Sequence, residues 1–343
     1  MPADTQAGAV QLHISLGKCL VAPSAEHQLL VAFQFGPDSD DSSRPGVVNT
    51  GLMPLHPDSP DSGPRFEGWW YRGEVTHRAV GQVRIASCAD YAVALHQVAD
   101  TEPEQFQQVT QAAYREILQA IATTNHPDIV KIWNYFGDIT RGDGDHEKYR
   151  QFSIGRATAF DDYCDVEQVI PTGTAIGTVA SDRFTIVSLS TSQDFRAAEN
   201  PRQVSAFEYP RQYGPRSPKF SRGGSVTSPD TRLFIVSGTA AIVGHESLHP
   251  DDIELQLEET FCNLDLLSNA ISALHGNSTP VAWASDSVLR VYLKHPDDIE
   301  FVREQLLQKI GTGASRISFL HADICRRELL VEIDGARILD NPA

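Results

Sequence analysis

The residue of greatest chemical interest is a glutamate in an apolar run near the C-terminus, Leu329, Leu330, Val331, Glu332, Ile333. Because side chains of a strand alternate between its two faces, Glu332 lies on the face opposite to Val331 and Ile333. A carboxylate in such a run lies either at a solvated edge or in a pocket that keeps it protonated. Burial raises the pKa of a carboxyl group, and enzymes hold general acids near neutral pH in this way. The run alone fits an ordinary outward glutamate as well as a general acid.

A second set of chemically useful side chains lies in residues 208–224, EYPRQYGPRSPKFSRGG. An arginine fork binds a carboxylate through two hydrogen bonds, so a cationic cluster in an acidic protein predicts a site for an anionic substrate. Each arginine taken singly also fits an ordinary surface cation. Two phenols and four cations fall within fourteen residues: Tyr209, Arg211, Tyr213, Arg216, Lys219 and Arg222.

The overall charge excludes several classes of partner. The formal net charge of the chain is −17, whereas nucleic acids and anionic membranes bind basic surfaces. We therefore expect neither as a partner. The N-terminal sequence lacks the basic start and apolar core of a signal peptide, and no apolar run is long enough to cross a bilayer, which predicts a cytoplasmic protein.

The spacing of cysteines and histidines indicates neither a metal site nor a disulfide framework. The five cysteines, at positions 19, 88, 164, 262 and 325, form no CxxC pair, and the twelve histidines show no HExxH pattern. The glycines of PTGTAIG (171–177) lack the spacing of a nucleotide-binding loop. We therefore expect reduced thiols, no metal and no bound nucleotide.

The elements that would position these residues occur in the same order twice. Each copy predicts a helix, a strand, a second helix and a pair of strands. The offset of about 150 residues predicts a domain duplication. The ranges are 103–123, 129–136, 146–160, 172–177 and 184–189 in the first copy, and 251–274, 287–293, 296–310, 317–320 and 329–333 in the second.

Composition separates the duplicated parts. Residues 37–64 and 191–230 are rich in Pro, Gly, Ser and Asp, which predicts loops. We therefore divide the chain into three parts. Residues 1–190 contain a strand region, a loop and the first copy; residues 191–230 form a Tyr/Arg-rich active-site loop; residues 231–343 form the second copy.

Several segments resemble known families. Two segments resemble sequence patterns of the RidA/YjgF fold. They are LFIVSGTAAIVGHESLHPDDIELQLEETFCNLDLL and the closing strand LLVEID. The chorismatase family, which is built from RidA-like units, is similar over PRFEGWWYRGEV, IVKIWNYFGDI, YRQFSIGRATAF, PTGTAIG, AFEYPRQYGPRSPKFSRG and SGTAAIVGHES. With the closing strand these are seven ordered motifs across residues 64–338. The resemblance implies an α+β fold of two tandem RidA/YjgF-like α/β units, each a mixed sheet with helices on one face, in a trimer-like arrangement.

The resemblance also implies an activity. Chorismatases act on chorismate without a cofactor and remove its enolpyruvyl group as pyruvate. The resemblance places the general acid at Glu332, which would protonate the methylene carbon of that group. Chorismate is a dianion, so its site needs fixed cations and hydrogen-bond donors. The expected substrate-binding residues of these types are Arg156, Arg211, Arg216, Tyr209 and Tyr213.

Two small residues bear on the product. Hydroxybenzoate-forming members of the family have Gly and Cys at two positions where dihydrodiol-forming members have Ala, and this chain has Gly238 and Cys325. The resemblance therefore implies 3-hydroxybenzoate, formed through an arene oxide, with Cys325 as a selector of product and not a nucleophile. A mixture of 3- and 4-hydroxybenzoate and the dihydrodiol stay open as alternatives. Cys325 also fits a small buried apolar residue.

For several residues the sequence allows two roles, and for the whole chain it allows other functions. Asn134 fits a substrate contact or a backbone contact, and Arg156 fits a substrate contact or a structural ion pair. The aromatic triplet at 69–71 is typical of a core, while His245 and Glu246 fit loop bracing as well as catalysis. More distant functions are a RidA-like imine deaminase and a ligand-binding protein without chemistry. Because two fused units can replace part of a trimer internally, we expect a monomer.

Overall fold

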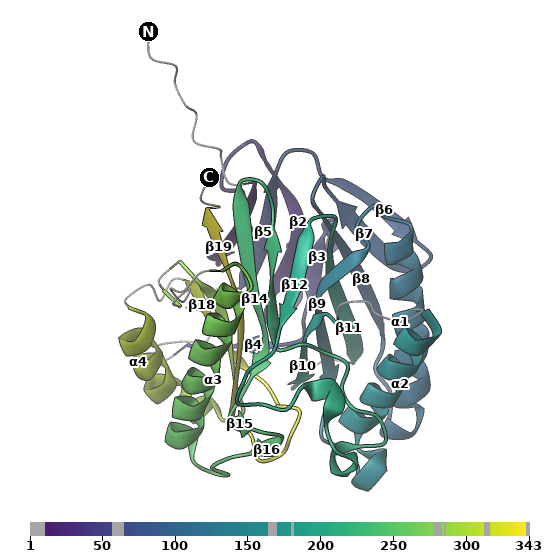
Figure 1. Ribbon diagram of the computed structural model, residues 1–343. Helices are drawn as coiled ribbons and strands as arrows, with labels where there is room; N and C mark the ends of the chain where they lie inside the picture. The colour runs from purple at the N-terminus through teal and green to yellow at the C-terminus, as the bar shows by residue number, and fades with distance from the viewer. Residues whose placement is uncertain are drawn as a thin grey trace.

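Three β-sheets pack around a common core, and helices lie outside two of them (Figure 1). This computed structural model describes residues 11–56, 65–163, 170–179, 182–276, 283–284, 286–311 and 316–340. Cys164 and the first ten residues lie outside the described part. Among the helices that are described, none is long and apolar enough to cross a membrane.

The first copy of the predicted elements forms a six-stranded sheet with two helices on one face. Its strand order is β10 (Thr172–Thr178), β9 (Asp128–Gly137), β11 (Arg183–Thr191), β8 (Tyr91–Ala99), β7 (Val83–Ser87) and β6 (Thr76–Val80). The helices α1 (Pro103–Ala122) and α2 (Lys148–Tyr163) pack against each other, and a buried apolar cluster joins them to the sheet. All five predicted elements of this copy are confirmed, whereas β6, β7 and β8 were not predicted individually.

The second copy forms a seven-stranded sheet under another pair of helices. Its strand order is β12 (Asp194–Ala198), β13 (Gly223–Thr227), β14 (Thr231–Thr239), β19 (Val331–Asp340), β17 (Val288–Leu293), β18 (Ile317–His321) and β4 (Met53–Pro54). The helices α3 (Ile253–Ala273) and α4 (Ile299–Ile310) cover one face. The Asp252 side chain caps α3 by accepting a hydrogen bond from the Leu255 N–H. The prediction is confirmed here too, although β19 begins two residues later and continues to Asp340.

A third, four-stranded sheet was not predicted as a separate unit. Its order is β1 (Leu12–Gly17), β5 (Phe66–Arg72), β2 (His27–Gln34) and β3 (Val47–Asn49), and the described residues add no α-helix to it. The aromatic triplet Trp69, Trp70 and Tyr71 lies buried in β5, so its interpretation as core is confirmed.

All three sheets contribute to the largest buried cluster, which includes Phe33, Trp133 and Tyr292. A buried ion pair crosses the same region, because Arg290 on β17 donates two hydrogen bonds to Glu67 on β5, at 2.8 and 2.6 Å. Arg290 also donates to the Tyr135 hydroxyl on β9 at 2.8 Å. Charge-assisted hydrogen bonds of this kind are stronger and more directional than neutral ones. The three sheets thus surround the shared core in a trimer-like arrangement. The sheet without helices takes the position that a third subunit would have in a trimer.

Two stretches predicted as loops contain strands. Residues 37–56 supply β3 and β4, and β4 pairs with β18 at the edge of the C-terminal sheet, whereas 57–64 lie outside the described residues. Residues 191–230 contain β12 and β13, with two short 3₁₀ turns, Ala206–Glu208 and Arg211–Tyr213, between them. Composition was misleading here because β3, β4 and β12 are short strands at the edges of their sheets, where Pro, Gly and Ser are tolerated.

Candidate active site

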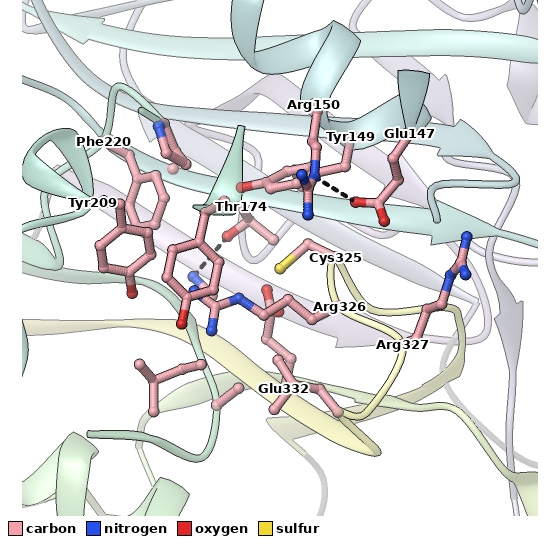
Figure 2. Close-up of a pocket in the computed structure, with 18 of the residues that line it drawn as sticks. Glu147, Tyr149, Arg150, Thr174, Tyr209, Phe220, Cys325, Arg326, Arg327 and Glu332 are labelled. Atoms are coloured by element: carbon pink, nitrogen blue, oxygen red, sulfur yellow. Dashed lines mark hydrogen bonds and ion pairs between the residues drawn. The ribbon is translucent and has the colours of Figure 1, made fainter. Parts of the chain in front are cut away.

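A cavity of about 380 Å³ lies between the two duplicated units. The N-terminal unit supplies α2 and β10, and the C-terminal unit supplies β14, β19 and the segment from Cys325 to Leu329. The loop between β12 and β13 adds the remaining wall (Figure 2). Because each unit contributes only part of the lining, the cavity exists only when both units are packed together.

Glu332 projects into this cavity from the central strand of the C-terminal sheet. Its neighbours Val331 and Ile333 pack under α3 and α4, which turns Glu332 to the opposite face. Figure 2 shows its side chain rising from β19 toward Cys325. The residue is 4% exposed, and within the described part of the chain its carboxyl group has no hydrogen-bond partner. Of the two interpretations of the apolar run, the structure supports a pocket.

The environment of Glu332 favours its neutral form. Burial is the largest cause and, with the charge of Asp334, raises its pKa to about 8, while Lys131 and Arg222 act in the opposite direction. A carboxyl group with this pKa carries its proton at neutral pH and can give it to a substrate. The geometry and the protonation state therefore both fit a general acid.

Gly238 makes room for the Glu332 carboxyl group. A Cβ atom at this position would lie 1.8 Å from Glu332 Oε1, well inside van der Waals contact. The backbone cannot simply retreat, because the Gly238 N–H donates to Thr174 Oγ1 at 3.1 Å. Any larger residue at position 238 must therefore displace the acid.

Cys325 lies beside the same carboxyl group as a neutral thiol. Burial, followed by the charge of Glu332, raises the pKa of the thiol far above its usual range. A thiolate is the nucleophilic form of cysteine, so this environment disfavours nucleophilic catalysis. Tyr149 on α2 also lines the cavity, and burial raises the pKa of its phenol. Both groups therefore face the acid in their protonated forms.

Two buried arginines line the cavity with donors that have no partner. Arg156 on α2 is 3% exposed, and its Nε and Nη2 have no hydrogen-bond acceptor among the described residues. Its guanidinium carbon lies 5.5 Å from the ring centroid of Tyr114 and 5.6 Å from that of Phe160. Arg222 donates from Nη2 to Tyr209 Oη at 2.6 Å, while its Nε is likewise unpaired in the part described. Buried cations with free N–H groups form a ready site for an anion.

Tyr209 and Tyr213, two of the expected substrate-binding residues, both line the cavity and contact a third arginine. The Arg326 guanidinium lies 4.0 Å from the ring centroid of Tyr213 and 5.3 Å from that of Tyr209. Arg326 also donates to the His245 carbonyl at 2.9 Å, and Tyr213 Oη lies 3.1 Å from His245 Nδ1. His245 is absent from the lining, so these contacts favour the bracing interpretation for it.

Three predicted site residues lie elsewhere, which corrects the expected set. Arg211 is exposed and forms a bidentate ion pair with Asp145 at 2.9 and 2.6 Å, and Arg216 pairs with Asp161. Neither lines the cavity, because an acid on the outer surface already neutralises each cation. Asn134 is fully buried between the Tyr114 hydroxyl and the Thr174 carbonyl. Its interpretation as a backbone contact is therefore the one the structure supports.

Some lining residues were not singled out from the sequence. Arg222 was noted only as part of the cationic stretch, and Arg326 was not noted as a site residue. Tyr149, Thr174 and Phe220 were not selected, although each lies inside a motif that carried the resemblance. The motifs were the usable signal, because local spacing does not show which side chain of a motif faces inward.

Comparison with known proteins agrees with this geometry. Residues 67–190 match the model of the chorismatase FkbO/Hyg5-like N-terminal family. A protein named chorismatase from Streptomyces rapamycinicus is 34% identical over 274 residues, 78% of this chain and 81% of the relative. A protein named 3-hydroxybenzoate synthase from Streptomyces hygroscopicus is 32% identical over 285 residues, which are 81% of this chain and 82% of the relative.

A solved structure supports the same relationship over nearly the whole chain. The crystal structure of a chorismatase superposes with a TM-score of 0.81 at 25% identity, covering 95% of this chain and 97% of that one. The resemblance first read from seven motifs is thereby confirmed. On its sequence, its three-sheet fold and its cavity, this chain is an enzyme of the chorismatase family.

Proposed function

We propose that this enzyme converts chorismate to 3-hydroxybenzoate and pyruvate without a cofactor. The observation that carries the proposal is the carboxyl group of Glu332, which has a raised pKa and no hydrogen-bond partner among the described residues. It lies in a cavity lined by Arg156 and Arg222, each of which keeps at least one nitrogen without an acceptor in the same part of the chain. The acid supplies the proton, and the arginines bind the two carboxylates of a dianion. The relative named 3-hydroxybenzoate synthase supports the same product.

The proposed reaction begins with proton transfer. Glu332 protonates the methylene carbon of the enolpyruvyl group, which leaves positive charge on the adjacent ether-bearing carbon. The C4 oxygen of the ring then attacks C3 while the bond from C3 to the pyruvyl oxygen breaks, and the C4 hydroxyl proton goes to the Glu332 carboxylate. This gives an arene oxide and pyruvate and restores the acid. The arene oxide opens and aromatises to 3-hydroxybenzoate. The two products together contain the atoms of chorismate, and nucleophile and leaving group belong to one molecule, so positioning does much of the work.

Product choice depends on how the ring lies against the acid. Gly238 leaves the space that the Glu332 carboxyl group occupies, and the neutral Cys325 thiol offers a weak donor beside it. We assign to these two residues the choice of intramolecular displacement over attack by water, which would give the dihydrodiol. A difference of ~1 to 3 kcal/mol in a packed pocket is enough to redirect an intermediate between two routes.

Product analysis tests the proposal. Purified protein is incubated with chorismate alone, aromatic acids are separated by chromatography, and pyruvate is measured by a coupled dehydrogenase assay. We expect 3-hydroxybenzoate and pyruvate in equal amounts. The dihydrodiol as sole product would overturn the assigned product, and a mixture with 4-hydroxybenzoate would restrict it. Chorismate binding in calorimetry without release of pyruvate would overturn catalysis and favour a ligand-binding protein.

A further inference from the structure

A second buried carboxylate lies behind the proposed acid. Asp334 is two residues after Glu332 on β19, so both side chains point to the same face, and Asp334 is 1% exposed. Its carboxylate is surrounded by donors. Trp133 Nε1 donates at 3.1 Å, Thr174 Oγ1 at 2.7 Å and Tyr292 Oη at 3.3 Å, while Lys131 Nζ lies 3.5 Å away.

The two carboxyl groups therefore have opposite surroundings. Asp334 has three hydrogen-bond donors and an ammonium group, which are partners of an ionised carboxylate, whereas Glu332 has none within the described residues. Two buried carboxyl groups close together do not both ionise readily, because the like charges repel. The donors decide which group carries the charge, and the other keeps its proton.

We propose that Asp334 is a positioning residue that keeps the catalytic proton on Glu332 by holding a fixed negative charge on the same face of β19. This inference rests on the proposed role of Glu332 as the acid. Asp334 itself does not line the cavity, so it acts through Glu332 and not on the substrate.

Other charged and titratable groups face Glu332 from the surrounding elements. Lys131 on β9 and Arg222 before β13 favour the ionised form of Glu332, while Cys325 and the α2 phenol of Tyr149 add no charge in their protonated forms. Lys131 is fixed by hydrogen bonds to Thr174 Oγ1 and the Val236 carbonyl, both at 2.7 Å. Desolvation lowers the pKa of Lys131 to about 8, the same region in which Glu332 titrates.

The same network also holds the glycine that contacts the acid. Thr174 Oγ1 donates to Asp334 and accepts from Lys131 Nζ and from the Gly238 N–H. The backbone that leaves room for Glu332 is thereby tied to the charge that keeps it protonated. One hydroxyl group thus couples the position of the acid to its protonation.

Removal of the negative charge of Asp334 and removal of the positive charge of Lys131 should shift the titration of Glu332 in opposite directions, which tests the inference. In Asp334→Asn, loss of the negative charge should move the titration of Glu332 to lower pH by about one unit, because repulsion no longer disfavours its charged form. In Lys131→Met, loss of the positive charge should move the titration to higher pH. A merely structural role would lower activity in both variants without shifts of opposite sign.

The titration is measured in the free enzyme and again in turnover. Infrared difference spectra follow the carbonyl stretch of the protonated acid, assigned as the band that disappears in Glu332→Gln. The alkaline limb of kcat with chorismate should shift in the same direction as this band. Asp100→Asn is the matched control, because Asp100 also pairs with a nearly buried lysine, Lys148, at 2.7 Å in the other unit. It should lower the melting temperature and leave the band unmoved.

Each outcome decides the inference. An unmoved titration in Asp334→Asn, or shifts of the same sign in both variants, would overturn it. If Asp334→Asn does not fold, Lys131→Met decides alone, and the absence of a shift to higher pH overturns the inference. A band that shifts as expected in an enzyme that does not turn over chorismate would support the inference and overturn the proposed function.

Discussion

Arginines occur both in the lining of the cavity and at its outer rim, the exposed stretch that carries Arg211 and Arg216. Two of the lining arginines, Arg156 and Arg222, keep nitrogens without an acceptor among the described residues. On the rim, Arg211 and Arg216 are exposed and already paired with Asp145 and Asp161. In the interior, Arg156 is buried with two unpaired nitrogens. Surface ion pairs contribute little to stability, whereas a buried cation without a partner is costly unless something binds it. The proposed function therefore assigns substrate binding to the arginines with unpaired nitrogens and not to the stretch with the most cations.

Removal of the interior acid is the strongest test of this difference. Glu332→Gln keeps the size of the side chain but removes the transferable proton, so kcat should fall by about 10²- to 10⁴-fold. Pyruvate release measures the loss, and calorimetry checks that chorismate still binds. A Gln variant with wild-type turnover would remove Glu332 from the mechanism.

Removal of the interior cation should have the next largest effect. Arg156→Met leaves a substrate carboxylate without its partner, so kcat/KM should fall by about 100-fold or more. Arg156→Lys is the matched control, because it restores the charge without the planar fork and should recover part of the loss. An unchanged KM in the Met variant would return Arg156 to a purely structural role.

A methyl group at the contact with the acid should alter both rate and product. In Gly238→Ala the new Cβ displaces the Glu332 carboxyl group, and misplacement of a catalytic group by about 1 Å costs on the order of 100-fold in rate. We also expect dihydrodiol among the products, by chromatography. The melting temperature should change little, and an unchanged product with unchanged kcat would contradict the contact.

Removal of the rim cations should have the smallest effect. Arg211→Ala and Arg216→Ala each break an exposed ion pair that solvent and salt screen, so kcat/KM should stay within about twofold of the wild type. Steady-state kinetics measures this. A tenfold rise in KM in either variant would mean that the rim also binds substrate, and the contrast between rim and interior would no longer hold.

Local patterns predicted much of the fold because helix and strand periodicity are local properties. The element order of both units and the existence of the strand that carries Glu332 follow from spacing within a few residues, whereas the burial of Glu332 did not. The third sheet was expected only as a strand region, because local spacing does not show that β1, β2, β3 and β5 pair with one another. The lining of the cavity was harder to predict, since it depends on residues far apart in the chain.

The arginines show this limit clearly. Within one stretch of loop, Arg211 and Arg216 point outward and Arg222 points inward, and nothing in the local sequence separates them. The difference is made by Asp145 and Asp161, which lie 66 and 55 residues away along the chain. In the same way, the close approach of Gly238 to Glu332 joins two neighbouring strand regions that only the folded sheet brings together.

The pairing of β4 with β18 has a consequence for the order of assembly. Pro54 and Leu320 lie about 270 residues apart along the chain, and contacts of such separation form slowly because a long loop must close first. Without β4, the outer edge of β18 would present unpaired backbone groups to other chains. The N-terminal segment thus covers Leu320 and His321 at one end of this edge strand.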